Sequence, residues 1–167
     1  MTSTSKLAAA LSLAEYGFHV FPLEPNSKLP AISAWQKKAT RDEKQIKRWW
    51  TCPVLEIEQD FNIGIFTGRF GLDRGLLVVD VDTKHGVDGR ESLAQLLERE
   101  SRELPKTLVS ETPTGGLHII FTIDESIKQG AHVLGKGLDI RSRGGYIVAP
   151  GSTIDTGEYK WINQVSI

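Results

Sequence analysis

The sequence predicts one domain, with one or two lobes, that mixes α-helices and β-strands. A chain of 167 residues fits a single domain and buries about two-thirds of its unfolded surface, so it needs no disulfide or structural metal to fold. Before residue 105, apolar residues recur at helical spacing in two segments, and a capping-box pattern indicates a further helix between them. From residue 106 onward, short apolar runs separated by glycine-containing turns predict mainly strands.

The first part of the chain alternates helices with strands. Residues 3–5 offer N-caps for a first helix that ends at Gly17, and residues 18–23 follow as a strand. The run Thr-Arg-Asp-Glu at 40–43 is a capping-box pattern. It predicts a second helix, which starts with Thr40 as its cap and stops before Pro53.

The rest of the chain is predicted to contain one further helix among a series of strands. Asp88 to Glu91 repeats the capping-box pattern and predicts a helix that ends before Pro105. The glycines after Arg143 indicate a hairpin between the two strands that flank them. Strands are predicted at residues 62–67 (ending in a turn at Gly68), 76–82, 107–112, 117–123, 138–142, 146–149 and 159–162.

Composition and charge exclude several classes of protein. Cys52 is the single cysteine, so a chain has neither a disulfide framework nor a cysteine zinc site, and no zinc is expected. A lone cysteine suits a reducing, cytoplasmic location. No long apolar run follows Met1, so we expect neither a signal peptide nor a membrane span. With a formal net charge of −1, the chain as a whole is not a basic nucleic-acid binder.

One segment is locally basic. Residues 28–48 are rich in Lys and Arg, and Trp35, Trp49 and Trp50 lie within or beside them. Interleaved cations and aromatic rings can hold a single nucleic-acid strand. The simpler interpretation, which we favour, is that the tryptophans face the core and the charges face water.

The rest of the chain is organised around the predicted strand 76–82. Four apolar residues precede Asp80 and Asp82, and alternation along a strand places both carboxylates on one face, with Val81 on the other. Two carboxylates at the end of a buried strand repel each other unless a cation lies between them. Mg²⁺ prefers oxygen ligands of this kind, so the strand indicates half of a metal site.

A histidine follows a glycine turn in the strand 117–123. Gly115 and Gly116 let the backbone approach a ligand closely and leave N–H groups free for an anion, which makes His118 a candidate contact for a triphosphate. Taken alone, such a histidine is more often an ordinary surface residue.

The strand 138–142 carries a second acidic and basic pair. Asp139 and Arg141 share a face, so Asp139 offers a third carboxylate and Arg141 a group for phosphate oxygens. For this segment alone, an ordinary Asp–Arg pair on a solvated sheet face is the favoured interpretation. Together with Asp80, Asp82 and His118, however, the set matches nucleotidyl transfer, in which two cations about 3.5–4 Å apart activate a hydroxyl and stabilise pyrophosphate.

In their order along the chain, these motifs resemble the bifunctional DNA primase/polymerase (prim-pol) family of the archaeo-eukaryotic primase superfamily. The chain is similar to the family in its DxD strand at 78–82, its sxH element at 114–118 and its hydrophobic-Asp element at 138–141. Further similar segments are NIGxxTG at 62–68, GGYxVAP at 144–150 and the Lys and Trp pattern at 28–50. The chain has Gly116 where strict sxH has a small hydroxyl residue, so the role of the nearby Thr114 stays open.

The resemblance implies an α+β fold, in which an N-terminal αβ lobe packs on an antiparallel sheet lobe similar to an RNA-recognition fold (RRM-like), with the active-site cleft between them. It implies that residues 1–167 form one catalytic domain, the N-terminal part of a longer helicase-fused protein of plasmid or phage replication. The substrates would be NTPs or dNTPs and a single-stranded DNA template. Mg²⁺ or Mn²⁺ would be bound by Asp80, Asp82 and Asp139, and the nucleotide by His118, Arg141, Gly115, Gly116 and Thr114.

Two other functions stay open. The run that ends in Asp80 and Asp82 also resembles the nucleophile motif of haloacid dehalogenase-type phosphatases, with Asp80 as the nucleophile. The acidic pair that this family needs later in the chain is missing here. A nucleic-acid-binding module without catalysis is the second alternative. Three retained carboxylates argue against it, because they destabilise a fold that has no metal to bind.

Overall fold

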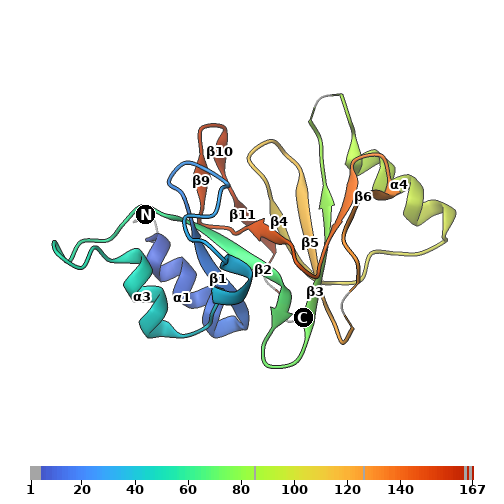
Figure 1. Ribbon diagram of the computed structural model, residues 1–167. Coiled ribbons are helices and arrows are strands. Elements are labelled where there is room, and N and C mark those ends of the chain that lie inside the picture. Colours follow the sequence, from blue (N-terminus) through green and yellow to red (C-terminus); the bar gives the residue numbers. More distant parts are fainter. Residues whose placement is uncertain (1–4, 85, 126, 164, 166) are drawn as a thin grey trace.

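α1 and α3 lie at one end of the protein and α4 at the other, with most of the strands between them (Figure 1). The computed structural model describes residues 5–84, 86–125, 127–163, 165 and 167. Among these residues, no helix is long and apolar enough to cross a membrane. The helices are α1 (Lys6–Tyr16), α2 (Trp35–Lys38), α3 (Glu43–Trp50) and α4 (Gly89–Arg99). The strands are β1 (Phe18–Leu23), β2 (Asn62–Phe70), β3 (Gly75–Val81), β4 (Leu108–Glu111), β5 (Leu117–Ile123), β6 (Gly130–Gly135), β7 (Leu138–Arg141), β8 (Tyr146–Val148), β9 (Thr153–Ile154), β10 (Gly157–Glu158) and β11 (Lys160–Asn163).

Most of these strands belong to two antiparallel sheets, which confirms the predicted α+β class. The larger sheet has six strands in the order β11-β4-β5-β3-β7-β6, and the smaller has three in the order β1-β2-β8. β9 and β10 pair only with each other. β3, the strand predicted to be central, lies between β5 and β7, so residues from three separate parts of the chain become neighbours.

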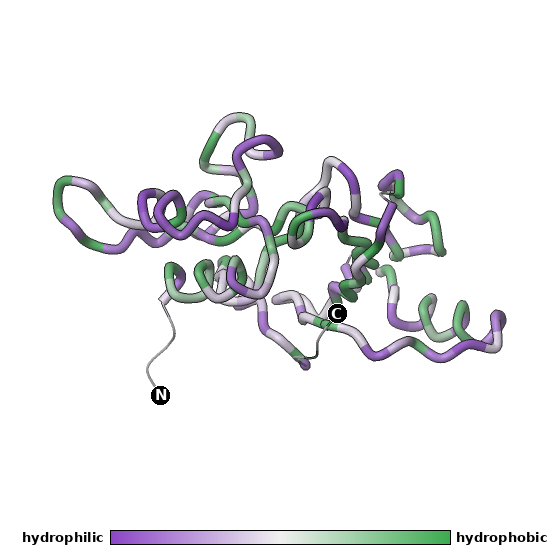
Figure 2. The backbone as a smooth tube through the Cα atoms, turned by 90° about the horizontal axis from the view of Figure 1, so that it is seen from below, coloured by the Kyte–Doolittle hydropathy of each residue, from purple (hydrophilic) through white to green (hydrophobic). Residues whose placement is uncertain are grey.

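Alternation along β3 gives the two faces of the larger sheet different partners. Val79 and Val81 face an apolar cluster that includes leucines of α4. Leu76 and Val78 face the other way, into the core shared with α1, α3 and the smaller sheet. Figure 2 shows an amphipathic pattern in α4, where apolar (green) and polar (purple) residues alternate along the tube. Asp80 projects from the same face of β3 as Val78, but it lies past the edge of this core. A charged group is therefore placed between the two sheets.

Two helix boundaries differ from the prediction. α3 starts after Asp42 rather than after Thr40, because the Asp42 carboxylate accepts a backbone N–H of the first turn. α4 has the predicted cap at Asp88 but ends at Arg99, since the chain turns at Ser101, whose φ is 50°. The short helix α2 is absent from the sequence prediction. The tryptophans agree with the favoured interpretation, because Trp50 is fully buried and the other two are half-buried in the core clusters.

The predicted hairpin between β7 and β8 is wrong. β7 pairs with β3 and β6 in the larger sheet, whereas β8 pairs with β2 in the smaller one. β2 continues through the predicted turn at Gly68, and its Thr67 donates its N–H to the carbonyl of Gly145 and its hydroxyl to that of Ser142. The Ser142 hydroxyl donates to the carbonyl of Leu76 in β3. The connection therefore crosses between the sheets.

Candidate active site

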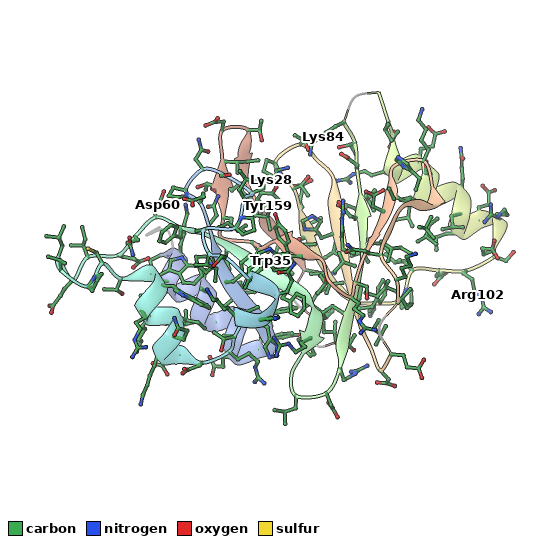
Figure 3. The ribbon with its side chains drawn as sticks, viewed as in Figure 1. Lys28, Trp35, Asp60, Lys84, Arg102 and Tyr159 are labelled. Carbon is green, nitrogen blue, oxygen red and sulfur yellow. The ribbon has the colours of Figure 1, made fainter. Side chains whose placement is uncertain are left out.

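A pocket of about 330 Å³ opens where the two sheets meet. The end of β3, the start of β5 and the end of β7 form one side, and β8 with the loop after β1 forms the other. Figure 3 shows Lys28 and Tyr159 close together between the sheets, with Lys84 above them. The lining residues are Lys28, Asp80, Val81, Asp82, Lys84, Thr112, His118, Arg141, Tyr146, Ile147, Val148 and Tyr159.

A row of polar side chains crosses the larger sheet at this pocket. Asp80 in β3 pairs directly with Asp139 in β7 on one side and with His118 in β5 on the other. Ser110 in β4 pairs with His118 and extends the row. Directly paired residues project from the same face of a sheet. The structure therefore brings together Asp80, Asp139 and His118, which are far apart in the sequence.

Arg141 joins the two carboxylates of this row. Its Nη2 lies 3.1 Å from Asp139 Oδ2 and 3.4 Å from Asp80 Oδ2. Because the three groups are only part-buried, the guanidinium keeps an exposed edge, and Arg141 also lines the pocket. A planar guanidinium presented in this way can bind phosphate oxygens.

Asp82 lies one residue beyond the end of β3, on the pocket side. Its side chain is 51% exposed, and its Oδ1 is 4.0 Å from Lys84 Nζ. Lys28 faces the same space from the loop after β1. Burial, followed by the charge of Lys84, lowers the pKa of Lys28, while Asp80 and Asp82 oppose this shift. The pocket is thus lined by two carboxylates, those of Asp80 and Asp82, and by several cationic side chains.

His118 is buried at the back of the pocket, contrary to the simpler expectation of a surface histidine. Its side chain is 7% exposed, and its ring stacks on Tyr159 with 6.0 Å between the ring centroids. Burial lowers the pKa of His118, although Asp80 acts to raise it, so the imidazole is neutral at neutral pH. Nδ1 lies 3.4 Å from the Ser110 hydroxyl, and Nε2 lies 3.7 Å from Asp80 Oδ1. This arrangement fits a tautomer with the proton on Nε2.

Tyr159 completes the wall behind His118. Burial and the nearby Asp80 carboxylate raise the pKa of Tyr159 to about 12, so the phenol keeps its proton at neutral pH. Its backbone N–H donates to Ser152, and its backbone carbonyl accepts from Gly151. These bonds hold the ring in place against His118.

The predicted glycine turn shapes the backbone rather than the pocket wall. At Gly116, a Cβ atom would lie 2.5 Å from the carbonyl oxygen of Val81, so only glycine allows this approach of β5 to β3. Gly115 has a φ of 83°, and its N–H donates to Thr112 instead of remaining free for an anion as expected. Thr114 is exposed beside this turn, 3.5 Å from the Thr112 hydroxyl that lines the pocket.

The donor atoms of the pocket suit a hard divalent cation only in part. Among the residues the structure describes, no three His, Cys, Asp or Glu side chains are grouped to hold a metal ion. Asp80 and Asp82 line the same pocket, and their oxygens are ligands that Mg²⁺ or Mn²⁺ accepts. Asp139 does not line the pocket, and its carboxylate accepts the backbone N–H of His132 at 2.9 Å in addition to a hydrogen bond from Arg141. The Asp80 and Asp82 pair is therefore the part that fits a metal.

Several residues at the pocket are not predicted from the sequence. In the sequence, Lys28 stands out only as part of the basic segment, and Tyr146 only as part of the run after Gly144-Gly145. Tyr146 donates its hydroxyl to the Lys28 carbonyl at 2.8 Å, which ties the loop after β1 to β8 within one wall of the pocket. Ser110 and Tyr159 have no signal in the sequence, because their role depends on their distance from His118 in space.

Comparison with known proteins agrees with the geometry. No curated protein matches the chain by sequence. The family described as "Bifunctional DNA primase/polymerase, N-terminal" matches residues 10–167, which include every residue of the pocket. This chain belongs to the family of N-terminal domains of bifunctional DNA primase/polymerases.

Proposed function

We propose that the protein is a metal-dependent nucleotidyltransferase that makes primers, extends DNA, or does both, on a single-stranded template. One observation carries this proposal: the pocket of a primase/polymerase family member contains Asp80 and Asp82 beside His118 and Arg141. NTPs or dNTPs would be the incoming substrates, joined to a growing strand with release of pyrophosphate.

Asp80 and Asp82 would hold Mg²⁺ or Mn²⁺ at the end of β3. Asp139 would become a further ligand when Arg141 turns from the carboxylates to the phosphates of a nucleotide. When bound, divalent cations neutralise the charge that develops on the attacking and leaving oxygens. The residues themselves contribute position and charge, which supply most of the catalysis in reactions of this type.

The other polar residues of the pocket would orient the triphosphate. Arg141, Lys28 and Lys84 bring positive charge to one opening, where phosphate oxygens form charge-assisted hydrogen bonds. His118 would donate Nε2–H to a phosphate oxygen, with its ring fixed by Ser110 and Tyr159. In this proposal Gly115 and Gly116 place His118 correctly, and Thr114 is a second, exposed contact.

The proposal extends to the architecture. The six-stranded sheet with α4 would correspond to the RRM-like lobe, and the smaller sheet with α1 and α3 to the N-terminal lobe. The pocket between the two sheets would then be the active-site cleft. Residues 1–167 would form one catalytic domain within a longer, helicase-fused protein of plasmid or phage replication.

The test is incubation with a single-stranded template, labelled nucleotides and Mg²⁺ or Mn²⁺, with the products sized on a gel. The expected result is a ladder of products that depends on template and metal and disappears when EDTA is added. Released phosphate without any extended product would contradict the proposal and favour a phosphatase with Asp80 as its nucleophile. Template binding without either product would instead indicate a non-catalytic module.

A further inference from the structure

Five exposed cations lie next to one another on the surface beside the pocket. We call them the cationic strip: Lys37 and Lys38 at the end of α2, Arg69 in β2, Arg143 between β7 and β8, and Lys128 before β6. Among the described residues, none of the five forms an ion pair with a carboxylate. Clustered cations without acidic partners repel one another, which an external polyanion would relieve.

Backbone contacts hold the members of the strip together. Arg69 donates from Nη2 to the carbonyl of Gln36 at 3.2 Å, which places it beside Lys37 and Lys38. The loop that contains Arg143 is fastened to β2 by the two hydrogen bonds that Thr67 donates. Lys128 is connected to Arg143 by an isolated β-bridge. The strip thus spans segments from four parts of the sequence.

The strip lies close to the pocket, although none of its five residues lines it. Arg143 follows Arg141, a lining residue, by only two positions, and the intervening Ser142 points into the core. The Arg69 guanidinium lies 5.5 Å from the centre of the Phe66 ring, which keeps this long side chain over the sheet surface. Phe66 packs in turn against Trp35, and Trp35 against Tyr146 of the pocket wall. A chain of packed aromatic rings therefore connects Arg69 of the strip to the pocket wall.

We propose that the cationic strip binds the sugar–phosphate backbone of the single-stranded template that enters the pocket. This inference rests on the proposed function, because a template base must be unpaired when it selects an incoming nucleotide. Contacts to phosphates carry no sequence information, so binding is independent of sequence and strongly dependent on salt. The strip lies on a strand, a short helix and loops that are tied to the sheet, and it offers no long helix to enter the groove of a duplex.

The test compares two double variants that each lose two positive charges. R69Q/R143Q removes the centre of the strip. R102Q/K106Q removes two exposed cations beyond α4, and Figure 3 shows Arg102 at the edge of the molecule, away from Lys28 and Lys84. Binding of a labelled single strand is followed by fluorescence anisotropy over a series of salt concentrations.

Each phosphate contact with a single strand contributes about 0.7 to the slope of log affinity against log salt concentration. We therefore expect R69Q/R143Q to reduce the slope by about 1.4 and to weaken binding about 25-fold near 0.1 M salt. R102Q/K106Q is expected to bind like the wild-type protein. Equal affinity and slope in the two variants would overturn the proposal, as would a loss confined to a duplex of the same sequence.

A second readout separates this inference from the proposed function. In the extension assay, R69Q/R143Q is expected to raise the KM for template about 25-fold, in line with its binding loss, and to leave the KM for nucleotide unchanged. If the wild-type protein binds single strands through the strip but incorporates no nucleotide, the proposed function is wrong and the template-binding role of the strip is supported. If incorporation is normal in R69Q/R143Q at low template concentration, the template-binding role of the strip is wrong and the proposed function is supported.

Discussion

At the scale of single residues, burial decides the protonation of the groups at the back of the pocket. His118 is neutral at neutral pH because burial lowers its pKa, and Tyr159 keeps its proton because burial and Asp80 raise its pKa to about 12. The two rings therefore add no charge beside Asp80. The two rings form a neutral wall that can donate hydrogen bonds. The cations of the pocket then supply the positive charge that an anionic ligand needs.

Replacing His118 by alanine should mainly weaken nucleotide binding. A hydrogen bond to a charged group is worth about 1.5–3 kcal/mol, so the Kd for nucleotide should rise between about 10-fold and 150-fold. Titration of a fluorescent nucleotide measures this, with single-strand binding as the control that should stay unchanged. An unaltered nucleotide Kd in a folded H118A variant would assign His118 a structural role only.

His19 in β1 should make the stability of the protein depend on pH. Its Nδ1 is buried without a hydrogen-bond partner in the described structure, and burial, then Arg69 and Arg41, lowers its pKa from 6.5 to about 4. The unfolded chain therefore binds more protons between these values. The contribution of neutral His19 to the free energy of unfolding is therefore complete above pH 6.5. This contribution is lost as the pH falls from 6.5 towards 4.

The His19→Leu variant should remove this dependence. Thermal unfolding of the two proteins at pH 7 and at pH 4.5 gives the comparison, and we expect the wild-type Tm to fall by roughly 3 °C more than that of the variant. Identical falls in Tm would show that His19 titrates normally in the folded protein.

At the scale of elements, alternation in β3 was enough to predict which residues share a face. Asp80 and Val78 do lie opposite Val79 and Val81, because one face of the strand meets α4 and the other meets the smaller sheet. Local capping was also predictable at Asp88, whose carboxylate accepts the N–H of Glu91. The prediction of a hairpin through Gly144 is wrong because hydrogen bonds from Thr67, which is distant in the sequence, direct that loop to the other sheet.

The contact between β3 and β5 should depend on Gly116. A Cβ atom there meets the Val81 carbonyl at 2.5 Å, whereas at Gly75, at the other end of β3, the nearest atom is 3.7 Å away. Gly116→Ala should therefore lower the free energy of unfolding by about 1–3 kcal/mol, and Gly75→Ala should change it far less. Urea denaturation of both variants gives the two values. Equal losses would mean that the close approach at Gly116 does not constrain the sheet.

At the scale of the whole molecule, the pocket exists only because two sheets meet. The acidic and histidine residues come from the larger sheet, whereas Lys28 and Tyr146 come from the other wall. The sequence shows which residues are polar on each strand, and the set of residue types, together with the family resemblance, predicts that Asp80, Asp139 and His118 serve one site. It does not show that Arg141 would join two of the carboxylates, because that depends on the register between β3 and β7.

We propose that the carboxylates at the end of β3 form the catalytic centre for nucleotide incorporation. The decisive measurement is the rate at which Asp80→Asn and Asp73→Asn variants add one nucleotide to a primer on a single-stranded template. Asp73 is exposed in the turn before β3 and does not line the pocket, so it gives a matched control. We expect D80N to be folded but to lose incorporation by about 1,000-fold or more, while D73N keeps the wild-type rate. Wild-type incorporation by D80N would contradict it.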